Sequence, residues 1–396
     1  MARNHIQVKP EKFPWLDLNR YTFSMGVEHK GVAYISGQTG SAYDAESRSV
    51  LCKGDIVEQT KIAWEKIGVI LQAAGMAYTD IVRTVDYVVP RGFPLYSKTG
   101  DVRRQFLGKS PVASTGVLVH SLLRPDALIE IQAIAVKGGK EVVIPAGPEY
   151  ERFKDLTYAP AVKAGGKLFF SGVVELEPTT AENQAKACYT RIDKTLQAAG
   201  ASYTNVVHIV DYVAPMTVEH YEAMAAVRQA HFGDSRPSVN AAVFHGILNP
   251  RGHLEVDVIA SLTGKREEIL VPGWEQSYQK LRSVPAVRMG NLVYFSSQAS
   301  IDHTTGKTVV ANYDLGAQAR QAYQNLRQVC SAAGVSMDDI AYTLELVPPT
   351  VMGDVRVLGQ VRREYFGASF PAATGLIIHQ NMRTNTIFSV AAVALA

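Results

Sequence analysis

Cysteine is scarce in this sequence, and so are the features that mark membrane or secreted proteins. The 396 residues include only three cysteines, too few and too scattered for a disulfide framework or a zinc site, so we interpret them as packing residues. No apolar run approaches the roughly 20 residues that cross a bilayer, and the N-terminal stretch has no apolar core like that of a signal peptide. These absences predict a cytoplasmic protein without a membrane partner. The three cysteines are Cys52, Cys188 and Cys330.

A strong charge of one sign is also missing. The net charge is +3 and no Lys/Arg run occurs, so the sequence shows no electrostatic footprint for nucleic acid. No P-loop, dinucleotide fingerprint, HExxH motif or CxxC pair is present. We therefore expect no cofactor and no metal, and a small-molecule substrate as the main partner.

One pattern, by contrast, occurs three times. Asp86–Pro90 (DYVVP) returns as Asp211–Pro215 (DYVAP) and as Glu345–Pro349 (ELVPP), at offsets of 125 and 134 residues. Three landmarks at identical spacing predict one domain of about 125 residues in three diverged copies. The same offsets relate two further sets, Gly75, Gly200 and Gly334, and His120, His245 and His379.

Each copy predicts the order β-β-α-β-α-β-β, with two amphipathic helices on one face of a mixed sheet, an α+β unit. The strands are rich in aromatic and β-branched residues, and each first helix ends in Ala-Ala-Gly, a C-cap signal. The early strands are expected at Val32–Gly37, Leu168–Val173 and Leu292–Ser297. The first helices are expected at Glu58–Ala74, Glu182–Ala199 and Gly316–Ala333, and the penultimate strands at Ala113–His120, Ser238–His245 and Ala372–His379.

The offsets shift once within the repeat. Ser36 and Ser171 are 135 residues apart, whereas later landmarks of the same two copies are 125 apart. The second copy therefore lacks about ten residues before its first helix, where the other copies have room for a hairpin. Pro-Gly punctuation between copies places the domains at 1–145, 146–272 and 273–396.

Three features resemble the RidA/YjgF family over essentially the whole chain. They are Ser36-Gly37-Gln38 after the early strand, the helix ending in Ala-Ala-Gly, and the closing strand Ile129–Val136. The resemblance implies a chorismate-mutase-like domain that assembles as a trimer, with sheets forming a central β-barrel, helices outside, and ligand clefts at the interfaces. Three joined copies would form an intramolecular pseudo-trimer from a monomeric chain, with further dimerisation left open.

The best-known activity that the resemblance implies is hydrolysis of enamine or imine intermediates to ammonia and a keto acid. The family holds the substrate carboxylate with an Arg at the start of the penultimate strand. Here Ser114, Val239 and Ala373 match that Arg, so the expected carboxylate clamp is absent from its usual position in all three copies.

Other family positions are retained unequally. The catalytic Glu is matched by Glu130 and Glu255, but by Ser389 in the third copy, and an aromatic hydroxyl is matched by Tyr158 alone. We therefore expect Glu130, Glu255 and Tyr158 to be catalytic. The expected substrate-binding residues are Ser114, Thr115, Asn240, Thr374, Phe23, Gly37 and Gly172.

Each of these residues also has a structural interpretation. Glu130 and Glu255 lie in apolar strands, where a carboxylate is costly unless it is paired or faces a cleft, but they could equally mark a solvated strand face. The repeated histidines favour a hairpin cap over a catalytic base. A helical Arg also recurs in all copies and could replace the lost clamp, although a salt bridge is the commoner role. These arginines are Arg103, Arg228 and Arg362.

The function we predict is a cofactor-independent deaminase or hydrolase that acts on a small enamine, imine or related C–N compound. The missing clamp argues against the usual 2-imino acid. The alternative is a non-catalytic small-molecule-binding or protein-stabilising module. A cyclic-amide hydrolase is less favoured, because no matching Ser-Lys set is found.

Overall fold

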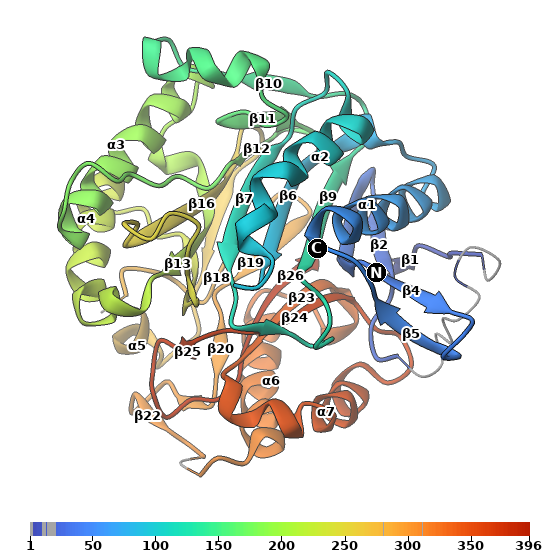
Figure 1. The fold of residues 1–396 in the computed structure, drawn as a ribbon. Helices are drawn as coiled ribbons and strands as arrows, with labels where there is room; N and C mark the ends of the chain where they lie inside the picture. Colours follow the sequence, from blue (N-terminus) through green and yellow to red (C-terminus); the bar gives the residue numbers. More distant parts are fainter. Residues whose placement is uncertain (1–2, 10–12, 14–20, 280, 311) are drawn as a thin grey trace.

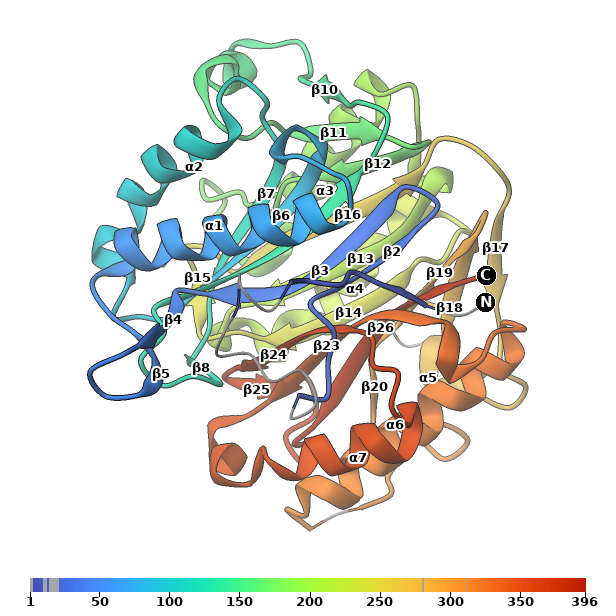
Figure 2. The same cartoon turned by 90° about the vertical axis from the view of Figure 1, so that its right-hand side faces the viewer.

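Two long helices in each repeat cover the outer face of one sheet (Figure 1). The computed structural model describes residues 3–9, 13, 21–279, 281–310 and 312–396. In Figure 2 the helix pairs of the first and third repeats lie outside the strands, and the helix pair of the second repeat lies at the left edge in Figure 1. The α+β class and the threefold repetition are thus confirmed.

The elements follow one order in each repeat, with short additions. The first repeat contains β1 (Asn4–His5), β2 (Gly26–His29), β3 (Val32–Thr39), β4 (Ser41–Asp44), β5 (Ser49–Cys52), α1 (Ile56–Ala73), β6 (Ile81–Val88), α2 (Thr99–Leu107), β7 (Ala113–Leu118), β8 (Ser121–Leu122) and β9 (Ile129–Val136). The second contains β10 (Glu141–Val143), β11 (Ala161–Ala164), β12 (Lys167–Phe170), α3 (Ala181–Ala198), β13 (Val206–Val213), α4 (Tyr221–Phe232), β14 (Ser238–Val243), β15 (Gly246–Ile247) and β16 (Leu254–Ser261). The third contains β17 (Arg266–Ile269), α5 (Glu275–Gln279), β18 (Ala286–Met289), β19 (Leu292–Phe295), β20 (Gln298–Ala299), β21 (Ile301–Asp302), β22 (Lys307–Thr308), α6 (Leu315–Ala332), β23 (Ile340–Val347), α7 (Val357–Phe366), β24 (Ala372–Ile377), β25 (Gln380–Asn381) and β26 (Ser389–Leu395).

Helix α1 shows why these segments are helical. Asp55 caps its N-terminus and forms a capping box with Glu58, which satisfies backbone donors that the first turn leaves free. Trp64 and Ile67 lie on its buried face. The helix stops before Gly75, whose φ of +64° suits a residue without a side chain.

The second repeat differs from the others next to its first helix. Strands β4 and β5 form a hairpin in the first repeat, and β21 and β22 form one in the third. Between Phe170 and Ala181 the second repeat has no strand.

Each sheet has the same internal order, and its edge is completed by another repeat. In the first sheet the order is β1-β2-β3-β9-β6-β7-β15, with β6 and β7 parallel. Strand β15 comes from the second repeat, while β25 of the third repeat joins β14, and β8 of the first repeat joins β24. The three repeats therefore exchange short strands in a closed cycle.

The expectation of a central β-barrel is wrong, because serine side chains stand where strand pairing would have to continue. The backbone N–H of Ser114 donates to the Ser171 hydroxyl at 2.8 Å, and that hydroxyl donates to a carbonyl of its own repeat. The same arrangement joins the other sheets. It pairs Val239 N–H with Ser296, and Ala373 N–H with Ser36. The backbone bonds that cross beside these hydroxyls are isolated, such as the bond from Gly172 N–H to the Ser114 carbonyl at 3.3 Å, and form no continuous ladder. Three separate sheets therefore surround a shared core.

Apolar packing occurs in four clusters. Three lie between a sheet and its own helices, and they include Trp64, Tyr189 and Tyr323 respectively. The fourth draws side chains from all three sheets and fills the centre of the molecule. Because this core is shared, each repeat depends on the other two for the burial of its inner sheet face.

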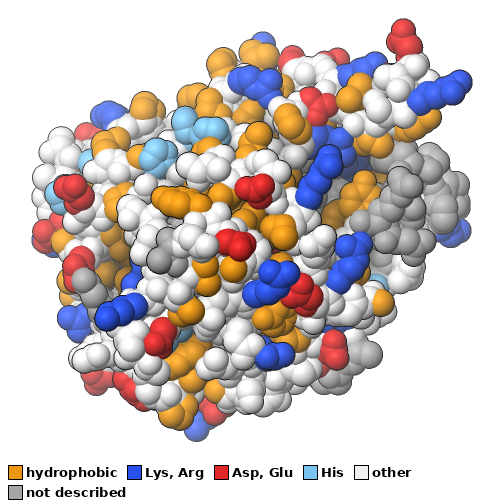
Figure 3. Space-filling view, turned by 90° about the horizontal axis from the view of Figure 1, so that it is seen from below, with side chains coloured by type: hydrophobic (Ala, Val, Ile, Leu, Met, Phe, Trp, Pro, Cys, Tyr) orange, Lys and Arg blue, Asp and Glu red, His pale blue; other side chains and the backbone are white. Residues whose placement is uncertain are grey.

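Two expectations from composition concern the surface charge and membrane-spanning segments. On the face drawn in Figure 3, Lys and Arg are interspersed with Asp and Glu. Among the described residues, no helix is long and apolar enough to span a membrane.

Candidate functional site

Three clefts lie where one repeat meets the next, and they are unequal in size. We name each after the residue at the family's glutamate position. The Glu130 cleft lies between repeats 1 and 3 and has a volume of about 790 Å³. The Glu255 cleft lies between repeats 1 and 2, with about 280 Å³, and the Ser389 cleft lies between repeats 2 and 3, with about 100 Å³.

In the Glu255 cleft, the carboxyl of Glu255 projects from β16 toward the first repeat. Glu255 is only 5% exposed, and its carboxyl accepts a hydrogen bond from the backbone N–H of Gly116 in β7. Burial, helped by the nearby charge of Asp257, raises the pKa of Glu255 to about 8. Gly172 makes room for it, since a Cβ at Gly172 would lie 1.9 Å from Glu255 Oε1. A carboxyl with this pKa can exchange a proton near neutral pH.

Arg103 of α2 reaches into the same cleft. Its Nη1 donates to the Ser114 hydroxyl at 2.6 Å, and its guanidinium lies 5.5 Å from the centre of the Tyr158 ring. Its Nε is buried and without a hydrogen-bond partner, and within the described parts of the chain Arg103 forms no ion pair. Ser114 is the residue that matches the family's clamp Arg. The guanidinium of Arg103 therefore stands beside the position from which the clamp is missing in the sequence.

The equivalent arginines of the other repeats are engaged in ion pairs. Arg228 is 1% exposed and bonds to Asp211, with Nη1 2.6 Å from Oδ2. Arg362 forms two bonds with Glu345, one of 2.7 Å from Nε to Oε1, and a third to Thr22. Only the first repeat leaves this arginine available to a ligand.

The Glu130 cleft has a different polar lining. Glu130 is 7% exposed, and its carboxyl forms no hydrogen bond or ion pair with any described residue. Burial raises the pKa of Glu130 to about 8, opposed in part by Lys66. Lys66 donates to Thr39 O and Ser41 Oγ, both at 2.9 Å, and burial lowers its pKa to about 8.

Several predicted site residues border this larger cleft. Phe23 and Gly37 line it, and a Cβ at Gly37 would lie 1.9 Å from Glu130 Oε1. Thr374 accepts a hydrogen bond from the backbone N–H of Gly37 at 3.2 Å. Ala373, which also lines the cleft, offers no polar side chain at the clamp position.

The Ser389 cleft has neither the family's carboxyl nor a polar residue at the clamp position. The Ser389 hydroxyl donates to Asn381 at 2.7 Å, and Val239 occupies the clamp position. The cation that lines this cleft is Arg383, which donates to the carbonyl of Gly306 at 2.6 Å.

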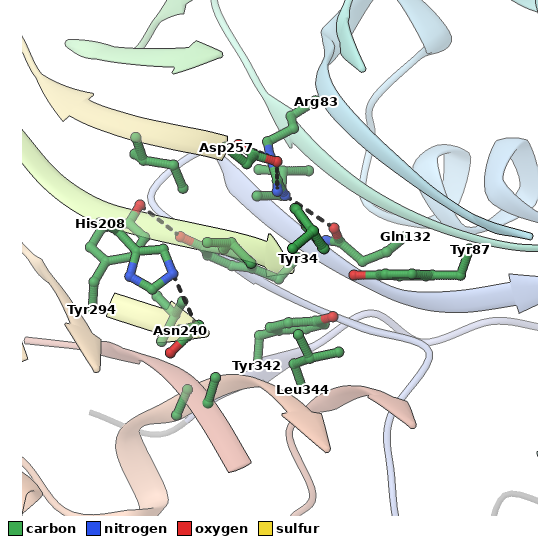
Figure 4. Close-up of a pocket in the computed structure, with 17 residues that line it drawn as sticks. Tyr34, Arg83, Tyr87, Gln132, His208, Asn240, Asp257, Tyr294, Tyr342 and Leu344 are labelled. Atoms are coloured by element: carbon green, nitrogen blue, oxygen red, sulfur yellow. Dashed lines mark hydrogen bonds and ion pairs between the residues drawn. The ribbon is translucent and has the colours of Figure 1, made fainter. Parts of the chain in front are cut away.

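Thr115 and Asn240 are turned toward the centre of the molecule instead of a cleft. Asn240 borders a cavity of about 60 Å³ that is lined by all three repeats, and Thr115 contacts Asp257, which also lines this cavity (Figure 4). There Thr115 donates to Asp257 at 2.7 Å, and Asp257 pairs with Arg83, while Asn240 bonds to His208 at 3.1 Å. Their polar groups are used by neighbouring side chains.

The repeated histidines mark the strand exchange. Each backbone N–H donates to a carbonyl of another repeat, and the rings of His120 and His245 lie 5.9 Å apart. Among the described residues, no cluster of His, Cys, Asp or Glu could hold a metal ion. The three bonds run from His120 to Ile377, from His245 to Leu118 and from His379 to Val243, at 2.9, 2.9 and 3.0 Å.

Two cleft residues escaped the sequence analysis although a signal was available. Lys66 and Arg191 are related by the same offset of 125 residues as the other landmarks. Lys66 lines the Glu130 cleft and Arg191 lines the Glu255 cleft, where it pairs with Glu175.

Comparison with known proteins agrees with the repeated architecture. The sequence model described as Endoribonuclease L-PSP matches residues 18–137, 154–262 and 279–390. A RutC family protein of Pyrococcus horikoshii is 33% identical over 115 residues, which cover 29% of this chain and 86% of that protein. A 2-iminobutanoate/2-iminopropanoate deaminase of Capra hircus is 35% identical over 116 residues, 29% of this chain and 80% of the relative.

A solved structure adds a likeness over most of the chain. A crystal structure of a chorismatase superposes with a TM-score of 0.55 and 16% identity, covering 80% of this chain and 93% of the other. At that identity the likeness concerns the fold alone. Because the family model matches three successive segments that span most of the sequence, this chain belongs to the Endoribonuclease L-PSP (RidA/YjgF) family, with three tandem copies of its domain.

Proposed function

We propose that the Glu255 cleft hydrolyses the imine of a small 2-keto acid to ammonia and the keto acid. The observation that carries the proposal is the position of Arg103. It lies beside Ser114, unpaired, in the one cleft that also holds a buried carboxyl and Tyr158. The Capra hircus relative is a 2-iminobutanoate/2-iminopropanoate deaminase, a name that describes the same class of reaction.

The cleft residues would divide the work as follows. Arg103 binds the substrate carboxylate, because a planar guanidinium recognises a carboxylate with directional, charge-assisted bonds. Tyr158 lies under the guanidinium and holds its plane. Glu255 takes a proton from water as the oxygen bonds to the imine carbon, and it passes that proton to the nitrogen. The hydroxyl of this intermediate then gives its own proton to the nitrogen, the carbon–nitrogen bond breaks, and ammonia leaves as the carbonyl forms. The cavity of about 280 Å³ favours a small substrate.

This proposal revises the expectation that a 2-imino acid is a poor substrate. That expectation rested on the aligned positions Ser114, Val239 and Ala373, none of which is an arginine. The guanidinium of Arg103 reaches the position from α2 instead, so a carboxylate site can exist without an arginine on β7.

The direct test measures ammonia release from 2-iminobutyrate and 2-aminoacrylate, both generated in place by a dehydratase. We expect the protein to accelerate release. Glu255→Gln should lower kcat by about 10²-fold or more, as expected for a lost general base. Glu130→Gln changes the equivalent carboxyl of the other cleft and should have little effect. Full activity in Glu255→Gln would contradict the proposal.

We also propose that the single chain of 43.1 kDa is the working unit. The cyclic strand exchange is completed within one chain, so no second copy is needed to form the clefts. Light scattering that showed an obligate assembly of three chains would contradict this.

A further inference from the structure

The Ser389 cleft holds a row of hydrogen-bonded side chains that the proposed function does not use. Ser277 of α5 lies 2.7 Å from His303 Nδ1, measured from Oγ. The other ring nitrogen of His303, Nε2, lies 3.2 Å from Oε1 of Gln298. Ser277 and His303 both line the cavity. A hydroxyl, an imidazole and an orienting side chain in this order form the arrangement of an activated serine.

The surrounding bonds fix the direction of every proton in the row. Gln298 Nε2 donates to the carbonyl of Ser296 at 2.9 Å and to the Tyr278 hydroxyl at 2.8 Å. Since a carbonyl can only accept, the amide nitrogen must face Ser296 and Oε1 must face His303. Nε2 of His303 therefore carries the proton, and Nδ1 presents a lone pair to the Ser277 hydroxyl.

The environment keeps the imidazole neutral and its ring fixed. His303 is 6% exposed, and burial lowers its pKa to about 4, with the Arg383 charge acting in the same direction and Asp302 opposing it. The ring packs against two aromatic neighbours, with centroids 4.1 Å from Trp274 and 5.2 Å from Tyr278. The imidazole is therefore neutral throughout the neutral pH range, with the lone pair of Nδ1 directed at the Ser277 hydroxyl.

We propose that Ser277 is a nucleophile toward small acyl esters, in a site separate from the Glu255 cleft. Its oxygen bonds to the ester carbonyl carbon while its proton passes to His303 Nδ1. The carbon–oxygen bond to the alcohol then breaks, and the alcohol takes that proton. Water, activated by the same imidazole, releases the acid from the serine. The cavity of about 100 Å³ limits the acyl group to acetyl or a similar size.

Among the residues that the structure describes, the other two clefts have no such row. The corresponding wall of the Glu255 cleft supplies Tyr150, Arg152 and Phe153. The third repeat thus lost the family's carboxyl and clamp positions, and its cleft contains a different reactive group.

The test uses p-nitrophenyl acetate with the full chain. Release of p-nitrophenolate is followed, and acetylated peptides are located by mass spectrometry. We expect one acetyl group on Ser277, and a labelling rate that changes little with pH across the neutral range. Ser277→Ala should abolish this label, and His303→Gln should slow it by about 10²-fold.

Two further variants guard against a general effect on folding. Ser297→Ala removes another hydroxyl of the same cavity, one that is not bonded to His303, and should still be labelled. Ser277→Cys retains a nucleophile and should still be acylated. Absence of the label on Ser277, or an equal rate in His303→Gln, would overturn the proposal. Imine hydrolysis should be unchanged in Ser277→Ala, so this site and the Glu255 cleft can fail independently.

Discussion

The Glu255 and Glu130 clefts are equivalent by repetition and differ in the state of one arginine. In the Glu130 cleft, Arg362 is bound by Glu345 and Thr22. In the Glu255 cleft, Arg103 donates a hydrogen bond to Ser114, packs against Tyr158, and forms no ion pair with a described residue. The clamp position is Ala373 in the Glu130 cleft and Ser114 in the Glu255 cleft.

The acidic residue next to this arginine also differs between the two clefts. Asp86 stands at the position of Glu345, but its carboxyl accepts a bond from Tyr96 at 2.9 Å and none from Arg103. Burial raises the pKa of Asp86, and the Arg103 charge opposes that shift only in part. The length of the acid does not decide whether the arginine is paired, because Asp211 is equally short and still pairs with Arg228, whose clamp position is Val239. The feature that distinguishes the first repeat is the Ser114 hydroxyl, which accepts the hydrogen bond from Arg103. Equivalent arginines thus have different roles: Arg362 is held in an ion pair, and Arg103 is available to bind a ligand.

The largest expected effect separates the two arginines by stability. Arg362→Met leaves Glu345, 2% exposed, without its cation, and breaking such a buried pair costs about 3–5 kcal/mol. Arg103→Met breaks no ion pair and should cost about 1 kcal/mol or less. Urea unfolding of both variants measures the difference. Equal losses would mean that Arg103 is as structural as Arg362.

The second effect is on turnover. Arg103→Met should remove a charged hydrogen bond to the substrate, worth about 1.5–3 kcal/mol, and lower kcat/KM by about 10- to 100-fold. Arg103→Lys keeps the charge and should recover part of this loss. The comparison is made with the 2-imino acid and with a neutral imine, which has no carboxylate. An equal loss with both substrates would exclude Arg103 as a carboxylate clamp.

The sequence predicted the repeated units because their landmarks keep constant offsets. It could not predict that the sheets remain separate, since that depends on Ser36, Ser171 and Ser296 accepting bonds across the interfaces. These serines follow the offsets of 135 and 125 residues, but offsets alone do not say which atoms pair.

Part of the candidate site could be predicted from the sequence. Glu130, Glu255 and Tyr158 line the clefts, whereas Thr115 is turned toward the centre of the molecule. Neighbouring residues on a strand point to opposite faces, so Ser114 and Thr115 cannot both line the Glu255 cleft. The sequence named Arg103 only as one of three recurring helical arginines that could replace the clamp, with a salt bridge as the favoured role. It could not single out Arg103, because this arginine approaches from a helix eleven residues earlier in the chain than Ser114.

A third experiment makes one cleft resemble the other. Ser114→Ala places at the Glu255 cleft the residue that the Glu130 cleft has, and removes the acceptor that holds Arg103. We expect Arg103 to lose orientation and kcat/KM to fall by about fivefold, the equivalent of about 1 kcal/mol for one hydrogen bond. The loss should appear mainly in KM. Added to Arg103→Met, Ser114→Ala should have no further effect, since the two residues act together. Additive losses would show that Ser114 contacts the substrate independently.

The last comparison concerns how the free energy of unfolding depends on pH through the two buried carboxyls. Because the pKa of Glu255 in the fold is about 8, above the ordinary value near 4.5, the carboxyl contributes stability that is complete below pH 4.5 and lost as the pH rises through 8. Glu255→Gln removes this titration. It should match the wild type at pH 5 and exceed it at pH 8.5 by about 1 kcal/mol or more. Chemical unfolding at the two pH values measures the gain.

Glu130→Gln provides the matched comparison for this pH effect. Its pKa is also about 8, but Lys66 opposes the shift there, whereas Asp257 adds to it at Glu255. We therefore expect a gain of the same sign and no larger at Glu130. If neither variant gained stability at the higher pH, both carboxyls would be solvated and neither would have the raised pKa that the proposed base requires. A gain in both, with loss of turnover confined to Glu255→Gln, would show that burial prepares both carboxyls and that only the cleft with a free arginine uses one.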